Sequence, residues 1–263
     1  MKFYLIPPNK HLTFMNQGNA GYFCLAHHYV NDKQYREYFL TLRQHLNPNG
    51  FITLDNGSAE HSLVTEDILL DIVGELRPSE VIAPDVLFDM IQTVTNLQTF
   101  ASKMDSRGYT KHTTILGCPQ GSTKEEWLGC YEHMLNNPYV SAIGMSKIAI
   151  PKCWNNATGD TMIAKSRQQC IKHLKDNYLL RKPLHLLGMG EFTEYLYYYG
   201  IPYIRSSDSC YAMLAAMNGI SFKEGNTSRV PTDNSYFDAE LSPEVLQLGI
   251  SNISLLQRIY KDI

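Results

Sequence analysis

The sequence predicts an α/β fold, a closed TIM (β/α)8 barrel in a single domain, and three observations lead to this prediction. Short apolar stretches alternate with amphipathic ones, which is typical of strands and helices around a parallel sheet. The polar and glycine-rich turns all follow the predicted strands, which favours a closed barrel over an open sheet. The length of 263 residues suits one barrel, and we see no repeat or linker that would divide residues 1–263 into separate domains.

The first elements precede the regular part of the chain. Residues 3–6 are predicted as a short strand that ends at two prolines, and residues 21–29 as the first strand of the barrel. His27 and His28 fall in that strand, where neighbouring side chains point to opposite faces, so we expect no paired metal site there. Apolar and aromatic residues at spacings of three and four predict a helix over residues 31–46.

A strand followed by a turn and a helix then recurs as far as Asp208. Residues 219–222 are the best candidate for the eighth strand, and residues 245–260 are expected to be mostly helical, with Gly249 as a candidate break. A polar excursion over residues 151–160 precedes one of the helices. The predicted strands are 51–54, 80–83, 113–116, 142–143, 184–187 and 201–205, and the predicted helices are 65–76, 88–103, 123–135, 161–175, a short one that ends at Gly200, and 209–217.

Composition narrows the class of protein. Hydrophobic residues make up 44% of the chain and charged residues 19%, which provides for a continuous core and argues against disorder. The 23 Lys and Arg against 26 Asp and Glu give a formal net charge of −3. This is unlike the strongly basic composition of a dedicated nucleic-acid-binding domain. A nucleic-acid substrate would therefore need a local basic surface.

Cysteine usage and hydropathy bear on the compartment. The six cysteines are widely spaced and none forms a Cys-x-x-Cys pair, which favours free thiols in a reducing environment. The opening residues, MKFYLIPPNK, carry an apolar run of only four residues, too short for the core of a signal peptide. No run of about 18 apolar residues predicts a membrane span. We expect a cytoplasmic protein with no membrane association.

Polar residues and glycines follow the predicted strands at equivalent positions. In a barrel such residues converge on one mouth. Carboxylates there could serve as nucleophile and general acid/base at a glycosidic carbon, and Asp and Gln could read the N–H and C=O edge of a purine. Helix capping and ordinary turn formation are the structural alternatives for the same side chains. The residues concerned are Asp55, Asp85, Gln120, Gly144, Gly188, Gly190 and Asp208, with Asp208 as the candidate chemical centre.

A series of motifs in these turns resembles the tRNA-guanine transglycosylase superfamily in order and approximate spacing over roughly residues 50–215. The motifs are LDNG (54–57), APDVLFD (83–89), LGCPQGS (116–122), IGMSK (143–147), HLLGMG (185–190) and SSDSC (206–210). The resemblance implies a TIM barrel and an enzyme that exchanges a guanine base for a 7-deazaguanine without cutting the nucleic-acid backbone.

The resemblance also implies roles for single residues. Asp208 would be the nucleophile that attacks C1′ and forms a covalent glycosyl-enzyme intermediate, and Asp55 would be the general acid/base. Such chemistry needs one charged carboxylate and another that can carry a proton. The implied substrate-binding residues are Asp85 and Gln120 at the edge of the base, the backbone of Gly144 and Met145 at its carbonyl, and Gly188 and Gly190 in the turn after the strand.

Two departures from the family pattern narrow the interpretation. The tRNA enzymes carry a zinc site of three cysteines and a histidine after the nucleophile, whereas here only Cys210 and no histidine follow Asp208. The family motif DSGGFQ is replaced by DNGSAE at residues 55–60, which leaves the aromatic ring that would stack on the base unidentified. A short chain without this zinc site resembles the DNA-modifying branch of phages and bacteria (DpdA), which inserts 7-deazaguanines such as preQ0 into DNA.

We therefore expect a DNA-guanine transglycosylase that needs no metal or cofactor and flips its target base out of the duplex. Its partners would be DNA and a free 7-deazaguanine base, in the host cytoplasm if a phage encodes it, with formation of a homodimer left open. The near alternative is a tRNA-guanine transglycosylase. The sequence is also compatible with a non-catalytic nucleic-acid-binding subunit and with an unrelated barrel hydrolase that uses two carboxylates.

Overall fold

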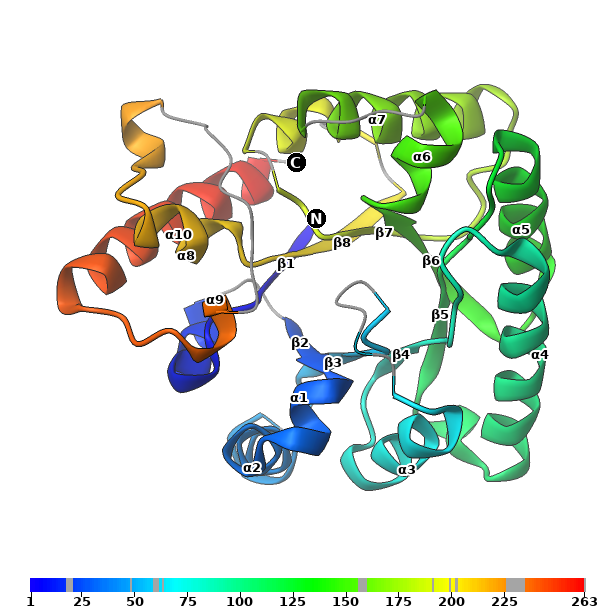
Figure 1. Ribbon diagram of the computed structural model, residues 1–263, viewed down its shortest axis with the longest axis horizontal. Coiled ribbons are helices and arrows are strands. Elements are labelled where there is room, and N and C mark those ends of the chain that lie inside the picture. The colour runs from blue at the N-terminus through cyan, green and yellow to red at the C-terminus, as the bar shows by residue number, and fades with distance from the viewer. Residues whose placement is uncertain are drawn as a thin grey trace.

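The computed structural model describes residues 1–17, 21–47, 49–58, 62, 64–155, 160–190, 192–198, 200–201, 203–225 and 235–262. Eight parallel strands form one sheet in the order β1-β8-β7-β6-β5-β4-β3-β2, and its two end strands, β1 and β2, lie side by side. The sheet is therefore a nearly closed barrel, with helices on its outside (Figure 1). The predicted TIM-barrel fold is confirmed.

The strands are short and largely buried, as expected of a parallel sheet that helices cover. Each is followed in sequence by helical structure on the outer face, the arrangement that right-handed crossovers impose on parallel strands. The strands are β1 Lys2–Leu5, β2 Gly21–Leu25, β3 Phe51–Asp55, β4 Glu80–Ile82, β5 Thr114–Gly117, β6 Val140–Ser146, β7 Leu184–Leu187 and β8 Ile204–Ser209.

Two helices of the outer layer, α3 and α5, begin at the side-chain caps that the sequence predicts. Oγ1 of Thr65 accepts a hydrogen bond from the N–H of Ile68, and Oγ1 of Thr123 accepts one from the N–H of Glu126. The α-helices are α1 Ala26–Asn31, α2 Lys33–Thr41, α3 Glu66–Leu76, α4 Met90–Ser106, α5 Lys124–Asn136, α6 Ala149–Asn155, α7 Asp160–Asp176, α8 Tyr211–Met217, α9 Ser235–Asp238 and α10 Pro243–Asp262. The π-helix η2 spans Leu42–Leu46, and the 3-10 segments are η1 Asn9–Gln17, η3 Tyr109–Lys111, η4 Phe192–Tyr198 and η5 Phe222–Glu224.

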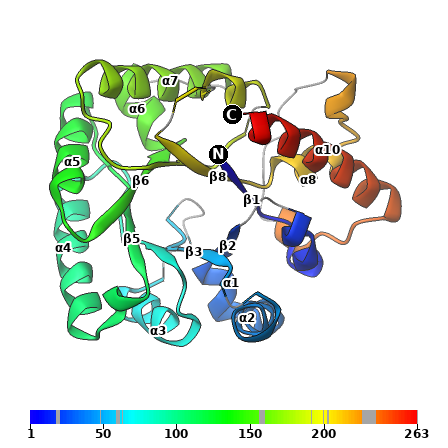
Figure 2. The ribbon, with the colours of Figure 1, turned by 180° about the vertical axis from the view of Figure 1, so that it is seen from behind.

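The prediction of the eighth strand is wrong. Residues 219–222 form no strand, because Gly219, at φ +69°, turns the chain after α8 and Phe222 already begins η5. The N-terminal segment takes the place instead: Phe3 pairs with Ser207 and Tyr4 with Asp208, and both figures of the whole chain show β1 between β8 and β2 (Figures 1 and 2). Phe3 and Tyr4 are fully buried there, which explains why this apolar run completes the barrel.

The strand predicted over residues 21–29 is too long. It ends at Leu25, and the chain turns directly into α1. His27 and His28 therefore lie on a helix rather than a strand, and their ring centroids are 4.2 Å apart instead of on opposite faces. Burial lowers the pKa of His27 to about 4, and the neighbouring His28 adds to this effect.

Three further boundaries differ from the prediction. Strand β8 begins later than expected and includes Asp208, which was predicted to follow it. Helix α6 occupies part of the expected polar excursion. Helix α10 runs through Gly249 without a break, because at that position it packs closely on α8: a Cβ there would lie 2.6 Å from the Sδ of Met213. Within the described residues, no helix is long and apolar enough to span a membrane.

Candidate active site

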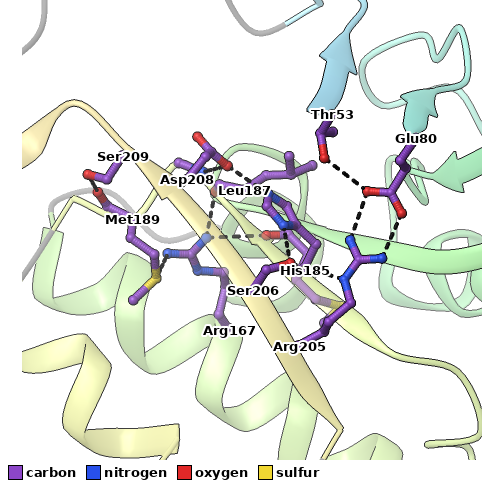
Figure 3. A network of polar contacts seen from close by, with 12 residues as sticks. Thr53, Glu80, Arg167, His185, Leu187, Met189, Arg205, Ser206, Asp208 and Ser209 are labelled. Carbon is purple, nitrogen blue, oxygen red and sulfur yellow. Dashed lines mark hydrogen bonds and ion pairs between the residues drawn. The ribbon is translucent and has the colours of Figure 1, made fainter. Parts of the chain in front are cut away.

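Asp208 lies near the carboxyl end of β8 with 5% of its surface exposed. Its Oδ1 accepts two hydrogen bonds of 3.0 Å, one from Nε2 of His185 and one from the peptide N–H of Gly188 (Figure 3). Within the described part of the chain, its Oδ2 makes no hydrogen bond and is not among the buried polar atoms that lack a partner. The carboxylate is thus held by one oxygen and open at the other.

His185 lies on β7 and is fully buried. Its Nδ1 is 2.7 Å from Oγ of Ser206, so both ring nitrogens have polar partners. The imidazole also stacks against two rings from β1 and β2, which do not neighbour β7: Tyr4 at 5.6 Å between centroids and Phe23 at 5.9 Å. These contacts fix both the position and the rotation of the imidazole beside Asp208.

A partly buried ion pair continues this chain of contacts through the barrel. Arg205 donates from Nε to Oγ of Ser206 over 3.1 Å and from its two terminal nitrogens to Glu80 over 2.7 and 2.8 Å. Thr53 adds a 3.2 Å hydrogen bond to the same carboxylate. Burial alone would lower the pKa of the Arg205 guanidinium, but its bonds to Glu80 outweigh this and raise the pKa. Figure 3 shows the resulting row from Asp208 to Thr53.

Asp85 and Gln120 form a second polar cluster, at the carboxyl ends of β4 and β5. Oδ2 of Asp85 accepts a hydrogen bond from the Gln120 amide, and its Oδ1 accepts one of 2.7 Å from Nδ2 of Asn56. Oε1 of Gln120 accepts in turn from the N–H of Phe88. Burial raises the pKa of the Asp85 carboxyl, while the bonds from Asn56 and Gln120 oppose the rise. The structure therefore brings these two predicted residues into direct contact.

Asp55 is the last residue of β3 and lies next to this cluster. Its Oδ2 accepts a 2.9 Å hydrogen bond from the N–H of Gly57, which forms the tight turn after the strand. Burial is the main cause that raises the pKa of the nearby Cys118 thiol, and the charges of Asp85 and Asp55 both add to it. The carboxylates of Asp55 and Asp85 therefore both lie close enough to Cys118 to affect the pKa of its thiol.

Gly144 and Met145 lie within β6, between the two clusters in the order of strands. They pair with His185 and Leu186 of β7, and the Met145 carbonyl accepts a 3.2 Å hydrogen bond from Arg167. A Cβ on Gly144 would lie 2.7 Å from Cδ1 of Leu187 and 2.9 Å from Cδ2 of Leu116, so a larger residue here would require these two side chains to move. Whether their backbone binds the carbonyl of a base stays a prediction.

Gly188 and Gly190 lie in the turn after β7, and Gly188 has φ +64°. This conformation directs its N–H to Asp208, and the N–H of Met189 donates to the Asp208 carbonyl over 3.0 Å. The half-buried side chain of Lys147 passes over the turn, because a Cβ on Gly188 would lie 2.8 Å from its Cδ. The Lys147 ammonium therefore lies beside Gly188, whose N–H binds Asp208.

A buried ion pair between Arg167 and Glu194 lies next to the turn after β7. Arg167 of α7 is fully buried and binds Glu194 through two hydrogen bonds of 2.7 and 2.6 Å. It also donates 2.7 Å to the Leu187 carbonyl and 3.0 Å to Sδ of Met189 (Figure 3). Burial disfavours the charged guanidinium, yet the charge of Glu194 raises its pKa above the ordinary value. The pair thus fixes the ends of β6 and β7 together.

Sequence reasoning assigned no role to Asn56 or His185, which organise the site around the predicted residues. A polar His185 inside the apolar strand LHLL was a signal that could have been used. Among the described residues, no group of three His, Cys, Asp or Glu side chains is placed to hold a metal ion. Comparison of the sequence with models of protein families and with curated proteins gives no match.

Proposed function

We propose that this chain is a base-exchanging pentosyltransferase that replaces guanine in DNA with a 7-deazaguanine such as preQ0. The observation that carries the proposal is the carboxylate of Asp208 at the carboxyl end of a barrel strand, fixed at Oδ1 and, among the described residues, unpaired at Oδ2. A nucleophile at a sugar carbon needs one unpaired oxygen with a defined direction of attack. Catalytic groups of TIM barrels lie at this end of the strands.

The proposed reaction proceeds in two displacements at C1′. Oδ2 of Asp208 attacks C1′ while the bond to N9 of guanine breaks, and the leaving guanine takes up a proton from the Asp55 carboxylic acid. The Asp55 carboxylate then accepts the N9 proton of the incoming base, whose N9 attacks C1′ and releases Asp208. One residue stays charged as the nucleophile and the other carries the proton, as paired carboxylates do in glycosyl transfer.

The Asp85 cluster supplies a recognition edge for the base. Each carboxylate oxygen has two lone pairs, so an oxygen that accepts from Asn56 or Gln120 can still accept from an N–H of a purine. Both Asp85 and Gln120 are almost fully buried, so a base without a complementary N–H would lose its bonds to water here and gain no hydrogen bond in return. Such an edge suits guanine and 7-deazaguanines, which share the same pyrimidine ring.

The test is base exchange on two substrates side by side. Purified protein is incubated with labelled preQ0 and either duplex DNA or tRNA, next to an Asp208→Ala control. Label that enters DNA and is lost in Asp208→Ala is the expected result. Label that enters tRNA instead would assign the chain to the tRNA-modifying alternative with the same nucleophile. Absence of label from both substrates, with tight binding of nucleic acid, would contradict the enzymatic proposal and favour the non-catalytic subunit.

A further inference from the structure

We propose that His185 is the positioning residue of the nucleophile: it holds Oδ1 of Asp208 so that Oδ2 faces the sugar carbon. The inference rests on the proposed function, because it assigns His185 a role through Asp208. His185 itself is fully buried and stands below the carboxylate in the barrel, so it does not touch the substrate. Its effect must pass through the carboxylate that it binds.

The two donors to Asp208 act on the same oxygen. Nε2 of His185 and the N–H of Gly188 both lie 3.0 Å from Oδ1. Two directional bonds to one oxygen fix the plane of the carboxylate, which a single bond would leave free to rotate. They also leave Oδ2 without a hydrogen-bond donor among the described residues. The geometry therefore separates a held oxygen from a reacting one.

The neighbours of His185 determine which nitrogen donates. The guanidinium of Arg205 can only donate, so Oγ of Ser206 accepts from it over 3.1 Å. The hydroxyl proton of Ser206 is then available for Nδ1 of His185, 2.7 Å away. If Nδ1 of a neutral imidazole accepts from Ser206, the ring proton lies on Nε2, where it points to Asp208. The acceptor-only carboxylate of Asp208 requires this tautomer, and the bond from Arg205 orients the Ser206 hydroxyl that supports it.

The ring is also held against displacement. Phe23 stacks nearly parallel to the imidazole, at 6° between the planes, and Tyr4 stacks at 27°. Arg205 is anchored in turn by its two bonds to the fully buried Glu80. The row Glu80, Arg205, Ser206, His185 therefore connects the interior of the barrel to the nucleophile. A purely structural histidine would need only satisfied nitrogens, whereas this one directs a donor at the reacting carboxylate.

The experiment compares kcat and KM for base exchange in His185→Gln, His185→Phe and the wild type. Gln can place an amide N–H near the position of Nε2, while Phe keeps the ring and the stacking but donates nothing. We expect His185→Phe to lower kcat about 100-fold with KM for the nucleic acid unchanged, as a misplaced reacting group does. His185→Gln should restore most of this loss, and His112→Gln, exposed at the amino end of β5, should leave kcat unchanged.

Ser206→Ala provides a second test, because it removes the hydroxyl that directs the imidazole but leaves His185 in place. We expect a smaller loss of kcat, about 10-fold, again without a change in KM. Equal losses in His185→Gln and His185→Phe would overturn the inference, since shape and not the donated bond would then matter. Wild-type kcat in a folded His185→Phe or, if that variant does not fold, in Ser206→Ala would also overturn it. A wild-type protein that exchanges no base would instead refute the proposed function, and the two failures are thereby distinguished.

Discussion

The peptide N–H of Gly188 donates a hydrogen bond of 3.0 Å to Oδ1 of Asp208, 20 residues further along the chain. The bond requires the left-handed conformation of Gly188, φ +64°, which residues other than glycine adopt at a cost. It joins the turn after β7 to the end of β8 and brings the two strongest motifs of the sequence, HLLGMG and SSDSC, into one site.

Gly188→Ala should therefore impair base exchange more than it impairs stability. The added Cβ strains the backbone by about 1–2 kcal/mol and meets the side chain of Lys147, which can move aside. The N–H to Asp208 shifts as a result, and we expect exchange to fall about 10-fold. Gly219→Ala is the matched control: its φ of +69° carries the same strain, but no atom lies within 4 Å of the new Cβ. Equal rates in the two variants would contradict the role of the Gly188 N–H.

Asp55→Asn tests the general acid/base. Asn still accepts the hydrogen bond from the N–H of Gly57 but cannot carry the proton between the two bases. We expect exchange to fall by about 10²–10⁴-fold at an unchanged unfolding midpoint. Asp89→Asn, exposed at the start of α4, retains its helix cap and should exchange base at the wild-type rate. An Asp55→Asn variant as active as this control would assign the proton transfer to another group.

The pH dependence of stability should reveal the buried carboxyl of Asp85. Burial raises its pKa in the folded chain above the unfolded value, so folding favours the protonated form. Its contribution to the free energy of unfolding is fully present below the unfolded pKa and is lost as the pH rises through the folded pKa. The difference in unfolding free energy between wild type and Asp85→Asn should accordingly fall with rising pH in this range.

Urea unfolding at a series of pH values measures this difference. Exposed Asp105→Asn controls for the substitution itself. A difference that rises with pH would mean that the bonds from Asn56 and Gln120 outweigh burial and stabilise the ionised form.

Arg167→Met should destabilise the fold strongly, because it leaves the Glu194 carboxylate buried without its partner. Breaking such a pair costs about 3–5 kcal/mol, and both side chains here are almost completely buried. Arg107→Met removes an exposed ion pair with Asp71 and should cost less than about 1 kcal/mol. The double variant Arg167→Met/Glu194→Met should recover part of the loss in urea unfolding. A double variant less stable than Arg167→Met would contradict this account.

Much of the fold followed from local patterns. The strands that precede Asp55, Asp85, Gln120 and Gly188 were predicted within a few residues, because apolar runs of strand length alternate with helical periodicity. Their polar ends were predicted to meet at one mouth, and the contact between Asp85 and Gln120 agrees with this. The roles of these residues in base exchange stay predictions.

The partners and boundaries of some strands were harder to predict from the sequence. Residues 3–6 were predicted as a strand but not as the one that completes the barrel. β1 pairs with β8, so the contact joins the first and the last strand along the chain, and no local pattern indicates such a pairing. Residues 219–222 are a similarly short apolar stretch, but Gly219 turns the chain after α8 and Phe222 already begins η5. The end of β2 was misplaced because His27, His28 and Tyr29 suit a strand as well as a helix.

The sequence by itself determined the barrel and the set of polar residues at its strand ends, because periodicity and turn chemistry are local properties. Only the tertiary structure decided that His185 and Gly188 bind the same oxygen of Asp208, and that Asn56 and Gln120 share the carboxylate of Asp85. Hydrogen bonds between residues 20 to 35 positions apart depend on strand register and barrel closure, which no short stretch of sequence contains. The direction in which a buried side chain points is fixed by packing of the whole barrel.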